Sequence, residues 1–448
     1  MGIYQTYQQD FRRNLTLALP IMAGQLGQVM VNFIDNIMVG RLGPEGLAAV
    51  SLSISIYISF VVVGMGISFA LPPLIAQADG EGDQQRISRL FKHSLIINIA
   101  YAFACVLIIE LGLPLIEYLG QDPEVVELAR PYLRLSGWAL IPMMLFQTLR
   151  ALANGVSETM PPMIASLTGN LFNVLLNYMF IYGKLGAPAL GVKGAALGTL
   201  IARCIMVVLL VLILIKWKNL WSYVKAANYR RYQSKLIKKV LSLGIPTSLQ
   251  MFFEVSAFAC AALIMGTLGA IPQAAHQIAI NLASMTFLTC TGLGMAATIR
   301  VGNNLGRKDS LGVQRVGYSA ILQVIAFMLI AAVVFVLFRN QLPLIYINDE
   351  AVITIASTLI IMSAIFQVSD GVQVVALGAL RGLQDVKIPM FITFIAYWMI
   401  GIPTSFLGAR YWNLGPVGVW LGLVLGLTVS ALLLTRRFQR ITNRSISK

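Results

Sequence analysis

Three carboxylates lie inside long apolar stretches of this sequence: Asp35, Glu254 and Asp370. A carboxylate near the centre of a bilayer costs about 2.5–3.5 kcal/mol on insertion scales, so such residues are rare and usually functional. In a low-dielectric environment a carboxylate either takes up a proton or needs a cation beside it. The chemistry that these residues indicate is reversible binding of a proton or a cation.

Asp35 has candidate partners further along the chain. In the stretch TGNLFNVLLNYMF, Asn173 and Asn177 are four residues apart, which places them on one face of a helix. Thr199, in the next apolar run, adds a hydroxyl. A carboxylate with neutral oxygens around it suits a hard cation such as Na⁺. The alternative is that the two asparagines only form hydrogen bonds between helices.

Glu254 and Asp370 form a second candidate Na⁺ or proton site, because both are expected near the middle of apolar spans. Two carboxylates that lie close together either share a proton or hold a cation. The alternative is that a buried acid pairs with a buried base and locks two helices together. Arg203 is the only base expected well inside a predicted span, away from its ends, so it can neutralise one acid at most.

The composition is that of a polytopic membrane protein. The chain has 448 residues, of which 58% are hydrophobic and 11% charged, and its mean hydropathy is +0.78. The net charge of +15 does not indicate nucleic-acid binding, because the basic residues sit in short connectors that face lipid headgroups. The four cysteines lack metal-ligand spacing and only two histidines occur, so no cofactor is predicted.

An apolar run of about 20 residues can span a bilayer. The sequence predicts an all-α fold of twelve such helices, at residues 15–39, 47–71, 92–113, 131–153, 160–182, 190–215, 241–265, 273–299, 316–338, 351–380, 388–408 and 415–435. With a cytoplasmic N-terminus, the inner connectors and the two ends hold about 25 of the 33 basic residues. Both termini are therefore expected in the cytoplasm, and the membrane is expected to be the bacterial inner (plasma) membrane.

The two halves of the chain repeat each other. LALP at 17–20 matches LGIP at 243–246, and VGRLG at 39–43 matches MGTLG at 265–269, both at the same offset along the chain. Further matches follow in the same order and at nearly the same offset. Each half has an even number of spans, so the repeat is parallel, with a cleft between its halves, as in transporters.

The repeat predicts four regions. An N-lobe covers residues 1–215, a basic cytoplasmic linker covers 216–240, a C-lobe covers 241–435 and a basic tail covers 436–448. Within this frame the buried acids are not equivalent, because Glu254 aligns with Gln28 and Asp35 aligns with Ala261. Ion binding is therefore not expected to be symmetric between the lobes.

Several stretches resemble the multidrug and toxic compound extrusion (MATE) family, and its NorM-like branch in particular. They are PIMAGQLGQVMVNFIDNIMVGRLG, AHQIAINLASM, RVGNNLG, ALANGVSETMPPM and FQVSDGVQVVALGALRGLQD. The resemblance implies two pseudo-symmetric six-helix lobes around a central cleft. It also implies export, by alternating access, of amphipathic and often cationic compounds in exchange for Na⁺ or H⁺.

The resemblance also implies roles for individual residues. The positions of Asp35, Asn173, Asn177 and Thr199 correspond to an N-lobe cation or proton site, and those of Glu254 and Asp370 to a C-lobe cation site. Some branches of the family have an aspartate where this chain has Asn177, so the charge of the first site is lower here. Polar residues expected in the cleft are Gln25, Asn32, Gln277 and Asn281.

The leading interpretation is a monomeric secondary-active multidrug antiporter whose partners are drugs, ions and membrane lipids. The alternative is a flippase or exporter of lipid-linked or other amphipathic metabolites, but such a protein needs several cations in its cleft. An enzyme is not predicted, because no protease motif surrounds the paired acids. An ATP-driven pump is disfavoured because the sequence contains no GxxxxGK[ST] motif.

Overall fold

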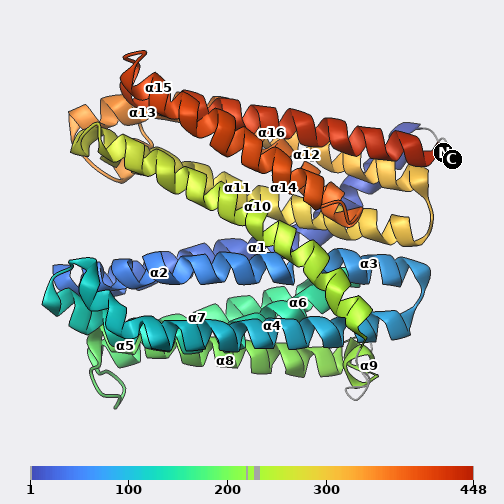
Figure 1. Ribbon diagram of the computed structural model, residues 1–448, viewed down its shortest axis with the longest axis horizontal. Helices are drawn as coiled ribbons and strands as arrows, with labels where there is room; N and C mark the ends of the chain where they lie inside the picture. Colours follow the sequence, from blue (N-terminus) through green and yellow to red (C-terminus); the bar gives the residue numbers. More distant parts are fainter. Residues whose placement is uncertain (1–2, 218–219, 227–232, 447–448) are drawn as a thin grey trace. The chain divides into compact units, whose positions relative to one another are not determined.

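The computed structural model describes residues 3–217, 220–226 and 233–446, and every regular element in them is a helix (Figure 1). The first half contains α1 (Ile3–Gly40), α2 (Pro44–Ser68), α3 (Leu71–Glu81), α4 (Gln84–Gly112), the 3-10 helix η1 (Leu113–Leu119), α5 (Pro123–Trp138), α6 (Leu140–Gly155), α7 (Met160–Tyr182), α8 (Gly191–Lys216) and α9 (Leu220–Lys225). The second half contains α10 (Ser234–Gly266), α11 (Ala270–Gly306), α12 (Ser310–Leu337), the 3-10 helix η2 (Pro343–Ile345), α13 (Glu350–Gly382), α14 (Lys387–Phe394), the π-helix η3 (Ile395–Gly401), α15 (Ile402–Arg410) and α16 (Gly415–Ile446).

Eleven helical segments in the described residues are long and apolar enough to cross a membrane. The twelfth predicted span, 131–153, is divided at Ala139 into α5 and α6, which have 16 residues each. Neither part alone reaches the roughly 20 residues that a span needs, whereas the two in succession do. In the predicted linker, 216–240, residues 218–219 and 227–232 lie outside the described residues, and so do residues 447–448 of the predicted tail.

The internal repeat is visible in the local backbone. Gly43 before α2 and Gly269 before α11 occupy matching positions of the repeat, and their φ angles are 118° and 120°, a region that favours glycine. Asp83 and Asp309, at the same offset, cap α4 and α12, because each side chain accepts a backbone N–H bond of 2.8 Å three residues later. Equivalent sequence positions therefore begin equivalent helices.

The chain folds into two compact units, and both boundaries fall inside helices. Unit 2 comprises Ala23–Ser248, and unit 1 comprises the residues up to Met22 together with those from Leu249 onward. The first turns of α1 thus belong to unit 1 while the rest of the helix belongs to unit 2, and α10 passes between the units in the opposite direction.

A proline lies close to each boundary. Pro20 is inside α1 and Pro246 is inside α10, each two residues before the last residue on its side of the boundary. A proline in the interior of a helix removes one backbone hydrogen bond and permits bending. Both helices that pass from one unit to the other can therefore bend near the place where they do so.

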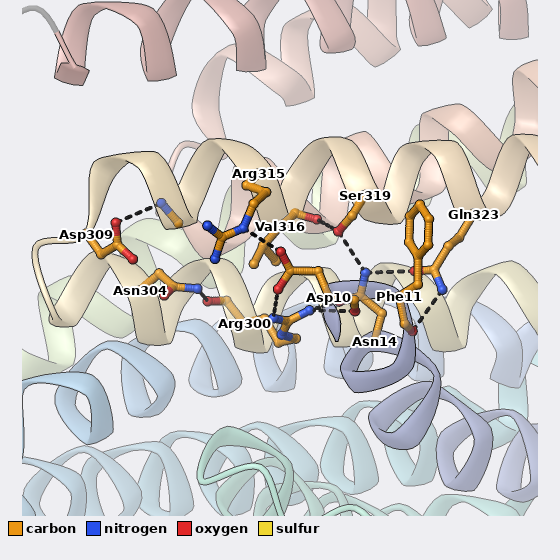
Figure 2. A network of polar contacts seen from close by, with 11 residues as sticks. Asp10, Phe11, Asn14, Arg300, Asn304, Asp309, Arg315, Val316, Ser319 and Gln323 are labelled. Atoms are coloured by element: carbon orange, nitrogen blue, oxygen red, sulfur yellow. Dashed lines mark hydrogen bonds and ion pairs between the residues drawn. The ribbon is translucent and has the colours of Figure 1, made fainter. Parts of the chain in front are cut away.

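The start of α1 is held in unit 1 by a buried ion-pair cluster (Figure 2). Asp10 is 2% exposed, and its two carboxylate oxygens each accept a hydrogen bond of 2.5 Å, one from Arg300 on α11 and one from Arg315 on α12. Arg300 also donates to the backbone carbonyl of Asp10 at 2.9 Å. Charge-assisted bonds of this kind are stronger than neutral ones.

Asn14, one turn further along α1, extends this cluster (Figure 2). Its amide nitrogen donates to Ser319 Oγ at 3.1 Å and to Gln323 Oε1 at 2.7 Å, and its carbonyl oxygen accepts from Arg300 at 2.5 Å. Gln323 in turn donates to the carbonyl of Phe11 at 3.0 Å. All donors of Asn14 are used, which explains how a fully buried amide is tolerated here.

The first half of α10 is held in unit 2 by close packing. Ser248 Oγ donates to the Val63 carbonyl of α2 at 2.8 Å. A Cβ added at Gly66 would lie 2.3 Å from Ser248 Cα, so only glycine permits this approach. Just before α10, the backbone N–H of Gln233 donates to His93 Nε2 on α4 at 3.0 Å. Each crossing helix is thus fixed at its start in one unit before it continues into the other.

We predict that Asp10→Asn lowers the free energy of unfolding by about 3 kcal/mol, because it leaves Arg300, whose side chain is 10% exposed, without its charged partner. The matched control is Glu117→Gln, which breaks an ion pair with Arg130 whose side chains are 59% and 42% exposed. Thermal unfolding of the purified variants measures both effects. Equal shifts for the two variants would show that the Asp10 cluster does not anchor α1.

Candidate functional site

Asp35 lies on α1 within unit 2, and α7 supplies its hydrogen-bond partners. Asn177 Nδ2 donates to Asp35 Oδ1 at 2.7 Å. The side-chain amide of Asn173 forms hydrogen bonds with both of its neighbours when its nitrogen faces the carboxylate. The nitrogen then donates to the two Asp35 oxygens at 3.1 and 3.2 Å, and the amide oxygen accepts from Thr199 Oγ1 at 3.3 Å. The four residues grouped from the sequence therefore lie together.

Gly198 makes room for Asn177 between α7 and α8. A Cβ added at Gly198 would lie 2.2 Å from Asn177 Oδ1 and 3.2 Å from its backbone nitrogen. Asn177 is fully buried, and its Oδ1 has no hydrogen-bond partner. A buried oxygen without a hydrogen-bond partner raises the free energy of the folded state, so Asn177 Oδ1 is available to a ligand or a water molecule.

Arg203 lies one turn after Thr199 on α8, and its charge interacts with that of Asp35. Its Nη1 donates to Tyr57 Oη at 2.5 Å and to the Ala139 carbonyl at 3.3 Å. The sequence identified Arg203 as able to neutralise one buried acid, and Asp35 is the acid whose charge interacts with it. The tyrosine that holds the guanidinium comes from α2, and sequence reasoning missed it.

The second cluster lies in unit 1. The charges of Glu254 on α10 and Asp370 on α13 interact with each other, and Asp370 is buried. Gln373 Nε2 lies 3.4 Å from Glu254 Oε1 and donates to Tyr397 Oη at 2.9 Å, while the Tyr397 hydroxyl lies 3.2 Å from Gln373 Oε1. Tyr397 belongs to the π-helix η3, and π-helices are frequent at functional sites.

Arg381 corrects one expectation from the sequence. Arg203 was predicted to be the only base well inside a span, but Arg381 also lies in a membrane-length helix, because α13 continues to Gly382, beyond the predicted end at residue 380. Arg381 Nη2 donates to Gln250 Oε1 at 2.9 Å, and its charge interacts with that of Glu254. The stretch FQVSDGVQVVALGALRGLQD already contained Arg381 and Gln373 at helical spacings from Asp370, which is the signal that could have identified them.

Gln367 and Ser363 add unsatisfied polar groups to the same face of α13. Gln367, three residues before Asp370, is 1% exposed, and neither its Nε2 nor its Oε1 has a partner. Ser363 Oγ, four residues earlier, is likewise buried without a partner. Buried polar atoms normally have partners, so this face of α13 is suited to hold an ion or water next to Asp370.

The donors in both clusters are hard oxygens. No group of three or more histidine, cysteine, aspartate or glutamate side chains that could hold a metal ion occurs within residues 3–217, 220–226 and 233–446. Carboxylate, amide and hydroxyl oxygens are the ligands of alkali and alkaline-earth cations. The two clusters can therefore bind a proton or a hard cation reversibly.

The four residues predicted to contact substrate divide between the units. Gln25 and Asn32 are on α1 in unit 2, where Gln28 donates to Asn32 Oδ1 at 3.2 Å. Gln277 and Asn281 are on α11 in unit 1, where the former donates to the latter at 3.0 Å. Asn32 and Gln277 are exposed. That these side chains line one cleft stays a prediction.

The fold and the buried polar clusters are those of a polytopic membrane transporter. Residues 20–179 and 246–407 match the MatE family. The second matched segment repeats the first at nearly the offset that separates LALP from LGIP, which agrees with the internal repeat. The chain therefore belongs to the MATE family, and it is a transporter rather than an enzyme.

Individual relatives cover nearly the whole chain. Multidrug resistance protein NorM of Photobacterium profundum is 34% identical over 443 residues, which are 98% of this chain and 97% of the relative. Multidrug resistance protein MdtK of Edwardsiella ictaluri is 33% identical over 440 residues, 97% of this chain and 96% of the relative.

Solved structures of the family share the fold. A crystal structure of MATE in the straight conformation has a TM-score of 0.89 at 22% identity and covers 98% of this chain and 97% of its own. The eukaryotic MATE transporter AtDTX14 has a TM-score of 0.86 at 20% identity, with 98% of both chains covered. The predicted all-α, twelve-helix architecture of the MATE type is confirmed.

We predict that Gly198→Ala destabilises the protein by about 1–3 kcal/mol, because the added methyl group displaces the Asn177 amide from Asp35. Gly112→Ala is the control, since a Cβ there meets nothing within 4 Å. Thermal unfolding of Gly198→Ala, of Asp35→Asn and of the double variant gives the coupling between the two sites. Strictly additive effects would show that Gly198 does not act through the Asp35 hydrogen bond.

Proposed function

We propose that this protein is a secondary-active multidrug efflux antiporter that exports amphipathic, often cationic compounds in exchange for Na⁺ or H⁺. The names of the NorM and MdtK relatives support drug efflux. The single observation that carries the ion coupling is the position of three carboxylates inside membrane-length helices, next to neutral polar side chains.

Ion binding is assigned to the two clusters. In unit 2 the candidate ligands are Asp35, Asn173, Asn177 and Thr199. In unit 1 they are Glu254 and Asp370, with Gln367 as a neutral donor that has no other partner. A cation at either carboxylate would offset the cost of burying its charge, and a proton would remove that charge.

The crossing helices support alternating access. Asp35 is on α1 and Glu254 is on α10, the two helices that begin in one unit and end in the other. Each contains a proline near the boundary, so it can bend there. Binding or release of an ion at either acid therefore acts on a helix that is fixed in both units.

The excess of basic residues in the predicted inner connectors supports an orientation with both termini in the cytoplasm. The bacterial relatives support placement in the plasma membrane of a bacterium. A direct check is the reactivity of single cysteines placed in the α15–α16 connector and in the C-terminal tail toward a membrane-impermeant reagent.

The test of function uses purified protein in liposomes loaded with ethidium, under a Na⁺ gradient alone or a pH gradient alone. We expect the gradient of the coupling ion to drive ethidium movement in the wild type. Glu254→Gln and Asp35→Asn should each reduce that movement at least tenfold if their carboxylate binds the ion.

Glu110→Gln is the control, because Glu110 bonds Arg134 at 3.0 Å and Trp138 at 3.1 Å, neither of which is a proposed ion ligand, and it should leave movement unchanged. Ethidium that moves under neither gradient would contradict the antiport proposal. Such a result would favour export of lipid-linked metabolites, the alternative drawn from the sequence.

A further inference from the structure

The two buried clusters carry different net charges. In unit 2, Asp35 faces one guanidinium, that of Arg203, so the cluster is neutral when both groups are ionised. In unit 1, the charge of Glu254 interacts with that of Arg381 and also with that of Asp370, so this cluster contains two acids and one base. Of these two clusters, that of unit 1 therefore retains a negative charge that an added cation would balance.

The hydrogen bonds around Asp35 also suit a carboxylate without a metal ion. Asn177 donates an N–H to Oδ1, and the Asn173 amide nitrogen reaches both oxygens of the same carboxylate. A bound cation would instead need the carbonyl oxygens of these amides to face it. Tyr132 is a further titratable group whose charge interacts with both Asp35 and Arg203.

Arg203 is fixed in place by groups from two other helical segments. Tyr57 Oη accepts from its Nη1 at 2.5 Å, and the Tyr57 hydroxyl points to Met143 Sδ at 3.8 Å. The carbonyl of Ala139, at the junction of α5 and α6, accepts from the same nitrogen at 3.3 Å. The junction that divides the fourth span thus provides an acceptor for a guanidinium inside the membrane.

The repeat shows that this arrangement belongs to one half of the chain. GVKGAALG at 191–198 aligns with GPVGVWLG at 415–422, and the same offset places Leu427 opposite Arg203. Leu427 is fully buried in an apolar core cluster of unit 1. The guanidinium is therefore not part of the structural frame that the two halves share.

We propose that Arg203 is a specificity-determining residue, a built-in cation that balances Asp35 and makes Na⁺ a poor occupant of the site in unit 2. Where the protein uses Na⁺, the ion then binds at Glu254 and Asp370. This inference rests on the proposed ion-coupled transport, because it concerns the same carboxylates. A fixed unit charge several ångströms away, in a partly buried setting, weakens binding of a like charge about ten- to hundredfold.

The test measures Na⁺ binding to purified protein by the shift of the thermal unfolding midpoint, with N-methylglucamine replacing Na⁺ at constant ionic strength. Glu254→Gln serves as the background, since it removes one ligand of the other site. We expect almost no Na⁺-dependent shift in this background. Adding Arg203→Met should create a Na⁺-dependent shift. Its half-saturating Na⁺ concentration should be at least tenfold below that of the Glu254→Gln background, and adding Asp35→Asn should abolish the shift again.

Two further variants keep the test decisive if Arg203→Met folds poorly. Arg203→Lys keeps the charge and should resemble the background. Arg203→Gln removes the charge with less change in shape and should resemble Arg203→Met. A Na⁺ affinity that is the same with and without the positive charge at position 203 would overturn the proposal.

Binding in detergent also separates this inference from the proposed function. If liposomes show no ion-driven ethidium movement but the charge at position 203 still sets Na⁺ affinity at Asp35, antiport fails and the role of Arg203 stands. If movement is driven by Na⁺ and the Arg203 variants bind it as the background does, antiport stands and the role of Arg203 is wrong.

Discussion

Every buried carboxylate in this chain has to regain, from neighbouring groups, the stabilisation that it lost on leaving water. Asp10 regains it from two arginines, and the result is a fixed anchor at the start of α1. Asp35 regains it from two amides and a guanidinium held nearby by Tyr57. Glu254 and Asp370 have one guanidinium near them, that of Arg381, which is why we propose their cluster as the one that takes up a mobile cation or proton.

The positions of these acids connect ion binding with movement of helices. Asp35 and Glu254 lie on α1 and α10, and an earlier part of each helix is held in the unit that does not contain its acid. Pro20 lies between the Asp10 anchor and Asp35, whereas Pro246 lies two residues before Ser248, which is held in unit 2, and eight residues before Glu254. A change of charge at either acid therefore alters the balance on a helix that can bend but cannot detach, which is a simple way to couple an ion to alternating access.

The sequence predicted the fold class and the residues of the first cluster well, because both depend on local spacing. Hydropathy identified the spans, and a separation of four residues placed Asn173 and Asn177 on one face. It did not predict that Tyr57 and the Ala139 junction hold Arg203, or that a π-helix presents Tyr397 to Gln373. Those contacts depend on how different helices pack together, and the sequence pattern of a single helix does not predict such packing.

If the unbalanced charge in unit 1 creates the one metal-cation site, as we propose, the number of Na⁺ ions bound per chain reveals it. Equilibrium dialysis of purified wild-type protein against radioactive Na⁺ at alkaline pH, where protons do not compete, gives this number. We expect one ion per chain, lost in Glu254→Gln and retained in Asp35→Asn. Two ions per chain, none at all, or one that disappears in Asp35→Asn would contradict it.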